Sequence, residues 1–312
     1  MKNSIQLKSF PIQTTLNILL KDKTTNKNII WATDSYKEFG EQYSDDRQIT
    51  IVDLIGISPI MLQPRMMKEL EQQQKRTKSH AEVFTPAWLC NKMNNYCDEE
   101  WFGRKDIFNI ENGQAWDTIS EKIVFPQNKT WKQYIDSRRL EIACGEAPYI
   151  ISRYDASNGE IIDIKNRIGI LDRKLRIVGE NTDNESDWFK WTIRAFQSVY
   201  GYEYQGDNLL IGRINLLMTF VDYLRYKWNR EAKSAELRKI ANIISWNFWQ
   251  MDGLTGTVPL GEPIEEDYQF SFNFGDEDKI ENEVKNKTPK CKIYDWRAGK
   301  SILYESLKKR ES

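Results

Sequence analysis

The sequence contains very little histidine and cysteine, and these scarcities limit the chemistry that the chain can carry out. His80 is the only histidine among 312 residues, which excludes a histidine-rich metal site as the main reactive centre. A serine or cysteine nucleophile activated by histidine would have to use this same residue, and no nucleophile motif points to it. The four cysteines lack the spacing of a disulfide framework or a zinc site, so we expect reduced thiols in a cytoplasmic protein.

The sequence also lacks long apolar runs and an excess of charge of either sign. Its longest apolar runs, such as residues 215–223, are too short to span a bilayer, and no apolar segment of a signal peptide follows Met1. The net charge is −1, whereas a protein that grips DNA alone usually carries a basic face. The basic run 75–78 is typical of a solvated helix end, with phosphate contact as the alternative. We therefore expect the main contact with DNA to come from a partner.

Aromatic side chains, by contrast, are abundant enough for a sizeable core. There are 11 Trp, 14 Tyr and 13 Phe residues, and 40% of all residues are hydrophobic. We expect a small β-containing segment at 1–62, a main domain at 63–258 with insertions near 101–138 and 156–187, and an acidic loop with a terminal hairpin at 259–312. In the first segment, strand patterns cover Ser4–Phe10, Thr14–Leu20, Ile29–Trp31 and Ile49–Ile55.

The main domain alternates helical and strand patterns, which predicts an α/β fold. Thr85 is placed to cap a helix that starts at Pro86, because proline suits the first helical position. Helical patterns cover residues 64–78, 87–98, 148–154, 188–200, 207–229 and 232–242. Strand patterns cover 139–143, 200–204 and 243–248, with hairpin patterns at 167–178 and at 292–296 with 301–307.

A glycine turn follows the first strand of the main domain. Gly145 allows the backbone to approach a ligand where a Cβ would clash, and the helix expected after it offers N–H groups. The candidate ligand contacts around this turn are Glu141, Ala143, Glu146 and Tyr149. The competing interpretation is an ordinary tight turn of an α/β protein.

Acidic residues follow the two later strands. Glu203 ends a strand and precedes Tyr204, and one carboxylate can accept hydrogen bonds from both hydroxyls of a ribose. Glu180 follows a similar hydrophobic-glycine segment and is the alternative, but we prefer Glu203 because a long amphipathic helix comes after it. Asp252 follows the third strand.

Two segments, Ala81–Pro86 and Leu140–Tyr149, together carry a family resemblance. In this order they resemble the two S-adenosylmethionine-contacting motifs of amino-group (N6-adenine) DNA methyltransferases of the gamma arrangement, which include restriction-modification methylase subunits. The resemblance spans about residues 65–255 and implies a partial Rossmann-like sheet that binds S-adenosyl-L-methionine.

The resemblance also implies roles for individual residues. It implies that Glu141 and Glu146 contact the cationic amino-acid end of the cofactor, Glu203 the ribose and Asp252 the adenine amine. The loop that it implies at the methionine end of the cofactor consists of Glu82, Phe84, Thr85 and Pro86.

The catalytic tetrapeptide of that family, Asn/Asp-Pro-Pro-aromatic, occurs nowhere in the sequence. In the family this tetrapeptide accepts the N–H groups of the target amine and stacks on the flipped base. The resemblance therefore implies a split enzyme, in which a partner chain supplies the tetrapeptide, catalysis and most recognition of double-stranded DNA. A non-catalytic cofactor-binding regulator, a structural subunit, and methylation of RNA or protein through a partner are the alternatives.

Overall fold

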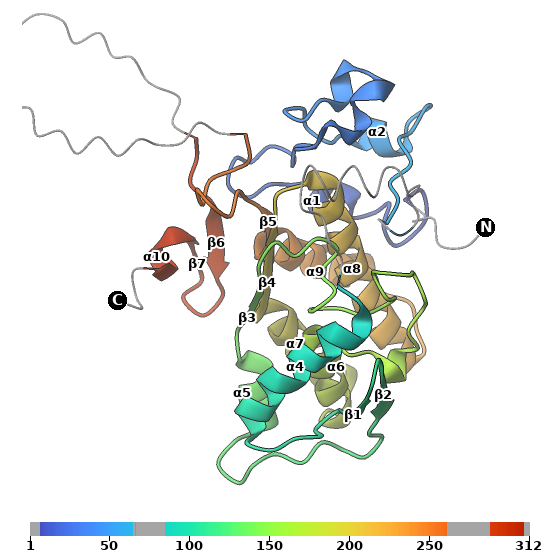
Figure 1. Cartoon of the computed structure of the whole chain (residues 1–312), viewed down its shortest axis with the longest axis vertical. Helices are drawn as coiled ribbons and strands as arrows, with labels where there is room; N and C mark the ends of the chain where they lie inside the picture. Colours follow the sequence, from blue (N-terminus) through green and yellow to red (C-terminus); the bar gives the residue numbers. More distant parts are fainter. Residues whose placement is uncertain (1–6, 65, 67–84, 261–287, 309–312) are drawn as a thin grey trace, which may run out of the picture.

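A small parallel sheet lies at the centre of the protein. The computed structural model describes residues 7–64, 66, 85–260 and 288–308 (Figure 1). The sheet contains β3 (Arg139–Glu141), β4 (Val199–Glu203) and β5 (Phe248–Gln250), in the order β3-β4-β5. Both pairings are parallel, so the carboxyl ends of all three strands meet at one edge. The expected α/β class is therefore confirmed.

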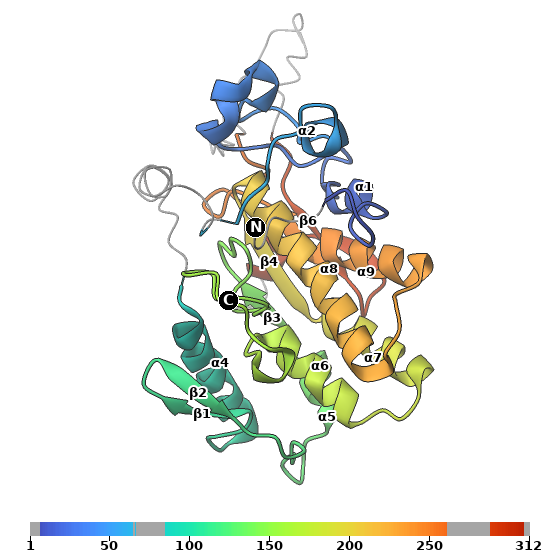
Figure 2. The same ribbon diagram turned by 90° about the vertical axis from the view of Figure 1, so that its right-hand side faces the viewer.

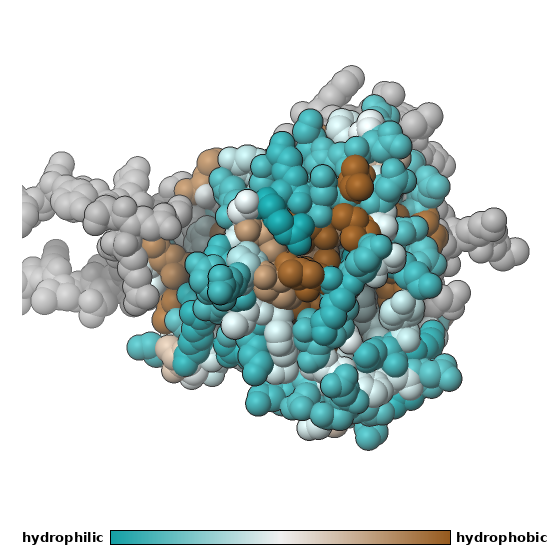
Figure 3. All heavy atoms as spheres, turned by 90° about the horizontal axis from the view of Figure 1, so that it is seen from below, coloured by the Kyte–Doolittle hydropathy of each residue, from teal (hydrophilic) through white to brown (hydrophobic). Residues whose placement is uncertain are grey.

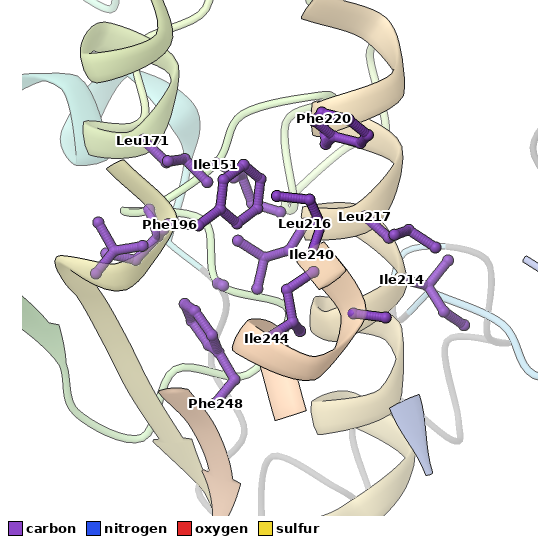
Figure 4. Close-up of a cluster of buried hydrophobic side chains, with 14 of the residues drawn as sticks. Ile151, Leu171, Phe196, Ile214, Leu216, Leu217, Phe220, Ile240, Ile244 and Phe248 are labelled. Carbon is purple, nitrogen blue, oxygen red and sulfur yellow. The ribbon is translucent and has the colours of Figure 1, made fainter. Parts of the chain in front are cut away.

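Helices cover one face of this sheet. α8 (Gly206–Trp228) and α9 (Ser234–Asn247) pack against β4 and β5, and α6 (Ile170–Glu180) and α7 (Glu185–Gln197) lie beside them (Figure 1). The shared core is formed by aliphatic and aromatic side chains whose burial stabilises the layer (Figure 4). Labelled members are Ile151, Leu171, Phe196, Ile214, Leu216, Leu217, Phe220, Ile240, Ile244 and Phe248.

The terminal hairpin covers part of the opposite face. β6 (Lys292–Asp295) and β7 (Lys300–Leu303) pair antiparallel, which confirms the expected hairpin. The second strand is shorter than predicted, because α10 (Glu305–Lys308) begins at Glu305. Trp249 and Met251 from the β5 region are buried with Cys291 and Ile293 from the hairpin. This second small core fixes the hairpin to β5.

The edge strand β3 stays largely uncovered on that same face. Register places Leu140 beside Tyr200 of β4, whose hydroxyl donates to the carbonyl of Tyr294 in the hairpin at 3.4 Å. Leu140 is 44% exposed, and Ile142, just beyond the strand end, is 66% exposed. In the described part of the chain, β3 therefore ends the sheet with apolar side chains facing solvent, which is a risk for edge-to-edge association.

The prediction of a helix at Pro148–Tyr154 is wrong. Only one turn forms there, in which Ile151 N–H donates to the carbonyl of Ala147 at 2.9 Å. The chain then leaves the core, includes the short 3₁₀ helix η4 (Ile164–Asn166), and returns at Gly169 to begin α6. We call residues 152–169 the excursion. The hairpin expected at 167–178 is also wrong, because most of that stretch is α6.

Hydrogen bonds join the two sides of the excursion. Ile170 N–H donates to the carbonyl of Tyr149 at 2.9 Å, and Leu171 N–H donates to that of Ile150 at 2.8 Å. Gly169 allows this close approach, because a Cβ there would lie 2.5 Å from the carbonyl oxygen of Ile150. The first turn after β3 and the start of α6 therefore form one continuous hydrogen-bonded unit.

The insertion near 101–138 adds three short elements. They are the antiparallel hairpin of β1 (Asn109–Asn112) and β2 (Ala115–Thr118), and the helix α5 (Trp131–Asp136). These elements lie with α4 (Ala87–Phe102) in the lower half of the molecule in Figure 1. Seen from below, that half is mostly hydrophilic around compact apolar patches (Figure 3).

The helix expected at 87–98 is confirmed as α4, but its cap differs from the prediction. Pro86, not Thr85, is the N-cap residue, and it offers no side-chain acceptor. Asp155 of the excursion supplies one instead, since its carboxylate accepts from Ala87 N–H at 2.9 Å. The expected helices at 188–200 and 207–229 are confirmed as α7 and α8.

Two predicted strands of the first segment are wrong. Thr14–Leu20 contains α1 (Leu16–Leu19), and Ile49–Ile55 contains α2 (Ile51–Ile55). The latter is helical because Thr50 and Asp53 form a reciprocal capping box. The 3₁₀ helices η1 (Asp34–Phe39) and η2 (Glu41–Tyr43) lie between them, and Ile30 forms only an isolated bridge with Gln48.

The prediction of a strand at 243–248 is correct only for its last residue. α9 continues through Asn247, and β5 begins at Phe248. Asn247 closes the helix, because its side-chain amide donates to the carbonyls of Phe196 and Val199 at 3.0 and 2.9 Å. The predicted helix at 64–78 and most of the predicted loop at 261–289 lie outside the described residues.

A buried arginine anchors the first segment to the sheet. Arg213 of α8 donates to the carbonyls of Leu19, Lys21 and Phe248, at 2.5, 3.1 and 2.8 Å. Burial lowers the pKa of Arg213 to about 10. The Gln250 side chain also donates to the carbonyl of Ile30 and accepts from its N–H, both at 2.9 Å. Residues 19–31 are therefore integral to the fold.

Candidate functional site

The predicted glycine turn and the predicted ribose acid are in direct contact. Glu203 ends β4, and its Oε2 accepts a hydrogen bond from Gly145 N–H at 2.8 Å. Three residues of the turn adopt left-handed conformations: Ala143, Gly145 and Ala147 have φ values of 46°, 53° and 65°. Such conformations are costly for alanine. The buried carboxylate of Glu203 is one of the contacts that hold them.

Helix α8 packs tightly against this turn. A Cβ at Gly212 would lie 3.2 Å from the carbonyl oxygen of Gly145. Glu146 is buried, and it accepts a hydrogen bond from the Tyr154 hydroxyl, which in turn accepts from Asn215 of α8 at 2.8 Å. Burial raises the pKa of Tyr154 well above its usual range, so this hydroxyl remains a donor to Glu146. The turn is thus fixed by side chains from β4, the excursion and α8.

Glu203 is favoured over Glu180 as the acid at a strand end. The Glu203 Oε1 also accepts from Gln205 N–H at 3.1 Å, and Met251 N–H donates to the Glu203 carbonyl at 3.0 Å. Glu180 instead ends helix α6, where it pairs with Arg176 at 2.7 Å. The alternative of Glu180 as a strand-end acid is therefore wrong.

Glu141 holds the first turn from inside. Its carboxyl oxygens accept from the N–H groups of Tyr149 and Ile150 at 3.4 and 3.2 Å. Burial raises the pKa of Glu141 to about 8, and these two hydrogen bonds only partly oppose that effect. At pH 7 the carboxyl is therefore mainly protonated. In this state it positions the backbone rather than presenting a negative charge.

Part of the loop expected at the methionine end lies beside the same turn. Thr85 lies beside the Tyr149 side chain, and Pro86 leads directly into α4. Glu82 and Phe84 lie outside the described residues. The structure thus brings Thr85 beside Tyr149, which follows the glycine turn about sixty residues later in the sequence.

Asp252 lies in the loop after β5, at the same edge of the sheet. Its carboxylate accepts from Leu254 N–H at 2.8 Å and from Thr255 N–H at 3.4 Å, which closes a short turn. Tyr204 is half-buried, and burial, with the nearby Asp252 charge, raises its pKa. Phe248 and Trp249 are fully buried and belong to the core.

The first segment covers the carboxyl end of β4, a position that sequence patterns barely indicate. Gly206, the first residue of α8, donates its N–H to the carbonyl of Trp31 at 2.9 Å, and the Tyr36 hydroxyl donates to Asp207 at 2.9 Å. Figures 1 and 2 both show this blue region at the end of the molecule where α8 begins. The β-rich run at 29–31 was the only signal of it.

Comparison of the chain with protein-family models, curated proteins and solved structures gives no match. Within the residues that the structure describes, no group of three or more His, Cys, Asp and Glu side chains is arranged to hold a metal ion. No described helix combines the length and apolar character needed to cross a membrane. The candidate site is therefore defined by its own geometry.

Proposed function

We propose that this chain is the S-adenosyl-L-methionine-binding subunit of a split DNA adenine-N6 methyltransferase of restriction-modification or phage-defence type. The observation that carries the proposal is the contact between Gly145 and Glu203 at the carboxyl edge of a parallel sheet. Ligands of open α/β sheets bind in the crevice at this edge. Thr85, Glu146, Tyr204 and Asp252 lie on segments that meet there.

Two features decide which contacts a bound cofactor would use. The Glu203 carboxylate accepts hydrogen bonds from the N–H groups of Gly145 and Gln205, and a carboxylate is the type of acceptor that binds ribose hydroxyls. Glu141 is buried and mainly uncharged at pH 7. The cationic amino-acid end of the cofactor would therefore depend on other acceptors of the turn, including its carbonyl oxygens.

The exposed side of β3 is the place where a catalytic partner would join. Leu140 and Ile142 offer apolar side chains beside an edge strand, and strand addition at such an edge supplies main-chain hydrogen bonds. The partner would bring the Asn/Asp-Pro-Pro-aromatic tetrapeptide that this chain lacks. It would also bring most of the basic surface for double-stranded DNA, because this chain has a net charge of −1.

Calorimetric titration with S-adenosyl-L-methionine tests cofactor binding. We expect micromolar affinity, and Glu203→Gln should weaken it about tenfold or more, equivalent to about 1.4 kcal/mol or more. Glu180→Gln is the matched control, because it removes the charge of the rejected acid at the end of α6. Equal affinities of both variants and the unsubstituted chain, with all three folded, would refute the assignment of Glu203.

Association with the partner has a separate test. Ile142→Lys should prevent co-purification with a chain that carries the tetrapeptide and abolish methyl transfer from labelled cofactor to duplex DNA, while cofactor binding persists. Ile110→Lys is the control, since Ile110 is also a half-exposed isoleucine but lies on the distant β1–β2 hairpin. Unchanged co-purification of Ile142→Lys would exclude the β3 edge as the joining surface.

One observation favours a second candidate function, that of a structural subunit. Glu141, Glu146 and Glu203 all accept hydrogen bonds from the protein itself, so the turn is complete without a ligand. A folded chain that joins the methyltransferase complex but binds no cofactor, alone or assembled, would support this alternative.

A further inference from the structure

A cavity lies far from the carboxyl edge of the sheet. Its volume is about 760 Å³, and its walls come from α6, the last turns of α8, Trp188 of α7 and the segment from Phe108 to Ser120. Its lining includes Tyr223, which lies 17 residues after Gly206 on α8, so the rise of the helix places the two about 25 Å apart. The cavity is therefore separate from the candidate cofactor site.

Three buried polar atoms on side chains that line this cavity have no hydrogen-bond partner. They are Nη1 of Arg167, Oδ1 of Asp172 and Nε of Arg173. The Arg167 side chain is 92% buried and that of Asp172 is completely buried, and their closest atoms, Nη1 and Oδ1, are 4.0 Å apart. The two atoms form an ion pair, but this distance is too long for a hydrogen bond, so each keeps its hydrogen-bonding capacity unused.

The remaining atoms of these groups are firmly held. Arg167 Nη2 pairs with Asp222 at 2.7 Å, and Asp172 Oδ2 accepts from Ser152 N–H at 2.8 Å. Arg173 pairs with Asp98 on α4. The three unpartnered atoms are therefore pre-positioned, and leaving buried polar groups unsatisfied is costly in a folded protein.

The other walls of the cavity are aromatic, and its rim is basic. Phe108 lies 5.1 Å from the Arg173 guanidinium, and Tyr226 is 56% exposed at the cavity. Lys165 and Lys227 also line it. Aromatic surfaces stack on planar rings, and lysines at a rim attract phosphate.

We propose that this cavity binds a mononucleotide, with the base inside and the phosphate at the rim. Two guanidinium donors and one carboxylate acceptor complement a base edge that offers an N–H donor together with ring or carbonyl acceptors. The aromatic walls contact the faces of the base. Lys165 and Lys227 meet the phosphate. Such a site would give the protein a nucleotide-responsive surface that is independent of methyl transfer.

Gly179 provides a variant that fills the cavity without damaging the fold. It lines the cavity within helix α6, and a Cβ added there would meet no atom within 4 Å. Gly179→Leu should therefore retain or raise the melting temperature, since glycine disfavours helix. Ala235→Leu is the matched control, because it places the same side chain at an exposed position of α9.

The test is calorimetric titration of the full chain with AMP, CMP, GMP and UMP, and with ribose 5-phosphate as the probe without a base. We expect at least one nucleotide to bind tenfold more tightly than ribose 5-phosphate. Gly179→Leu should abolish that binding, Tyr226→Ala should weaken it about fivefold or more, and Ala235→Leu should leave it unchanged.

Several outcomes would overturn the proposal. These are no binding of any of the four nucleotides, equal binding of ribose 5-phosphate, or nucleotide binding that persists in Gly179→Leu. Nucleotide binding that is lost in Glu203→Gln but kept in Gly179→Leu would place the nucleotide at the carboxyl edge of the sheet instead. S-adenosyl-L-methionine should bind Gly179→Leu normally, so the two sites can be judged separately.

Discussion

Glu141 should make the stability of this protein depend on pH between about 4.5 and 8. Its carboxyl has an ordinary pKa of 4.5 when exposed and a pKa of about 8 when buried under the glycine turn. Because the folded-state pKa is raised, the stabilising effect of protonated Glu141 is fully present below pH 4.5. It is lost progressively as the pH rises from about 4.5 to about 8, because over this range the unfolded chain releases the proton while the buried carboxyl of the folded protein keeps it.

The size of this change in unfolding free energy follows from the two pKa values. A difference of about 3.5 units corresponds to a free-energy change of about 5 kcal/mol across the full window, or about 1.4 kcal/mol per pH unit within it. Glu141→Gln provides the reference, because its amide oxygen can still accept from Tyr149 and Ile150 N–H but never ionises. Every other titratable group is common to both proteins, so their difference in unfolding free energy isolates Glu141.

The assay is urea denaturation followed by tryptophan fluorescence at pH 5, 6, 7 and 8. Wild-type stability should fall relative to Glu141→Gln at each step. A difference that stays constant from pH 5 to 8 would show that the folded protein ionises Glu141 normally, and the burial argument would then be wrong. Saturating S-adenosyl-L-methionine offers a further readout, since a cation bound near Glu141 would move the transition to lower pH.

Three substitutions test other parts of the framework by urea denaturation. Arg213→Met should lower the free energy of unfolding by about 3–5 kcal/mol, because it leaves several buried carbonyl groups without a donor. Arg225→Met, on the exposed end of the same helix, should lower it by less than about 1 kcal/mol. Similar losses in both variants would contradict the anchoring role of Arg213. Ser152→Ala should cost about 2–4 kcal/mol, since Ser152 Oγ accepts from two buried N–H groups, and a loss below about 0.5 kcal/mol would show that they find other acceptors. Gly169→Ala should lower the unfolding midpoint by separating α6 from the first turn, and an unchanged midpoint would mean that the backbone relaxes there.

Helical periodicity in the sequence accounts for only part of the correct predictions. The apolar residues of α7 recur at helical spacing and face the core, whereas α8 is buried on nearly all sides and α4 buries mainly polar residues such as Asn91 and Asp98. The terminal hairpin was found from two short strand patterns joined by a polar turn. Of the candidate site, the sequence indicates Gly145 and Glu203 as separate ligand contacts, and the hydrogen bond between them is apparent only in the structure.

The incorrect predictions share a physical cause. Residues 14–20, 49–55 and 167–178 are rich in β-branched side chains, but caps and tertiary contacts make them helical. The Thr50–Asp53 capping box was visible in the sequence and would have corrected one of them. The cap that Asp155 supplies to α4 could not be predicted, because it joins residues 68 positions apart.

The hydrogen bonds that join the two ends of the excursion make this loop a suitable place for inserting a foreign sequence. The ends of residues 152–169 are held by the bonds from Ile170 and Leu171, so their separation does not depend on the length of the loop between them. A peptide tag or a small fluorescent reporter inserted near Asn158, at the exposed turn, would leave the helix register intact. Such a reporter would sit within one loop of the glycine turn and could follow ligand arrival there by a change in emission.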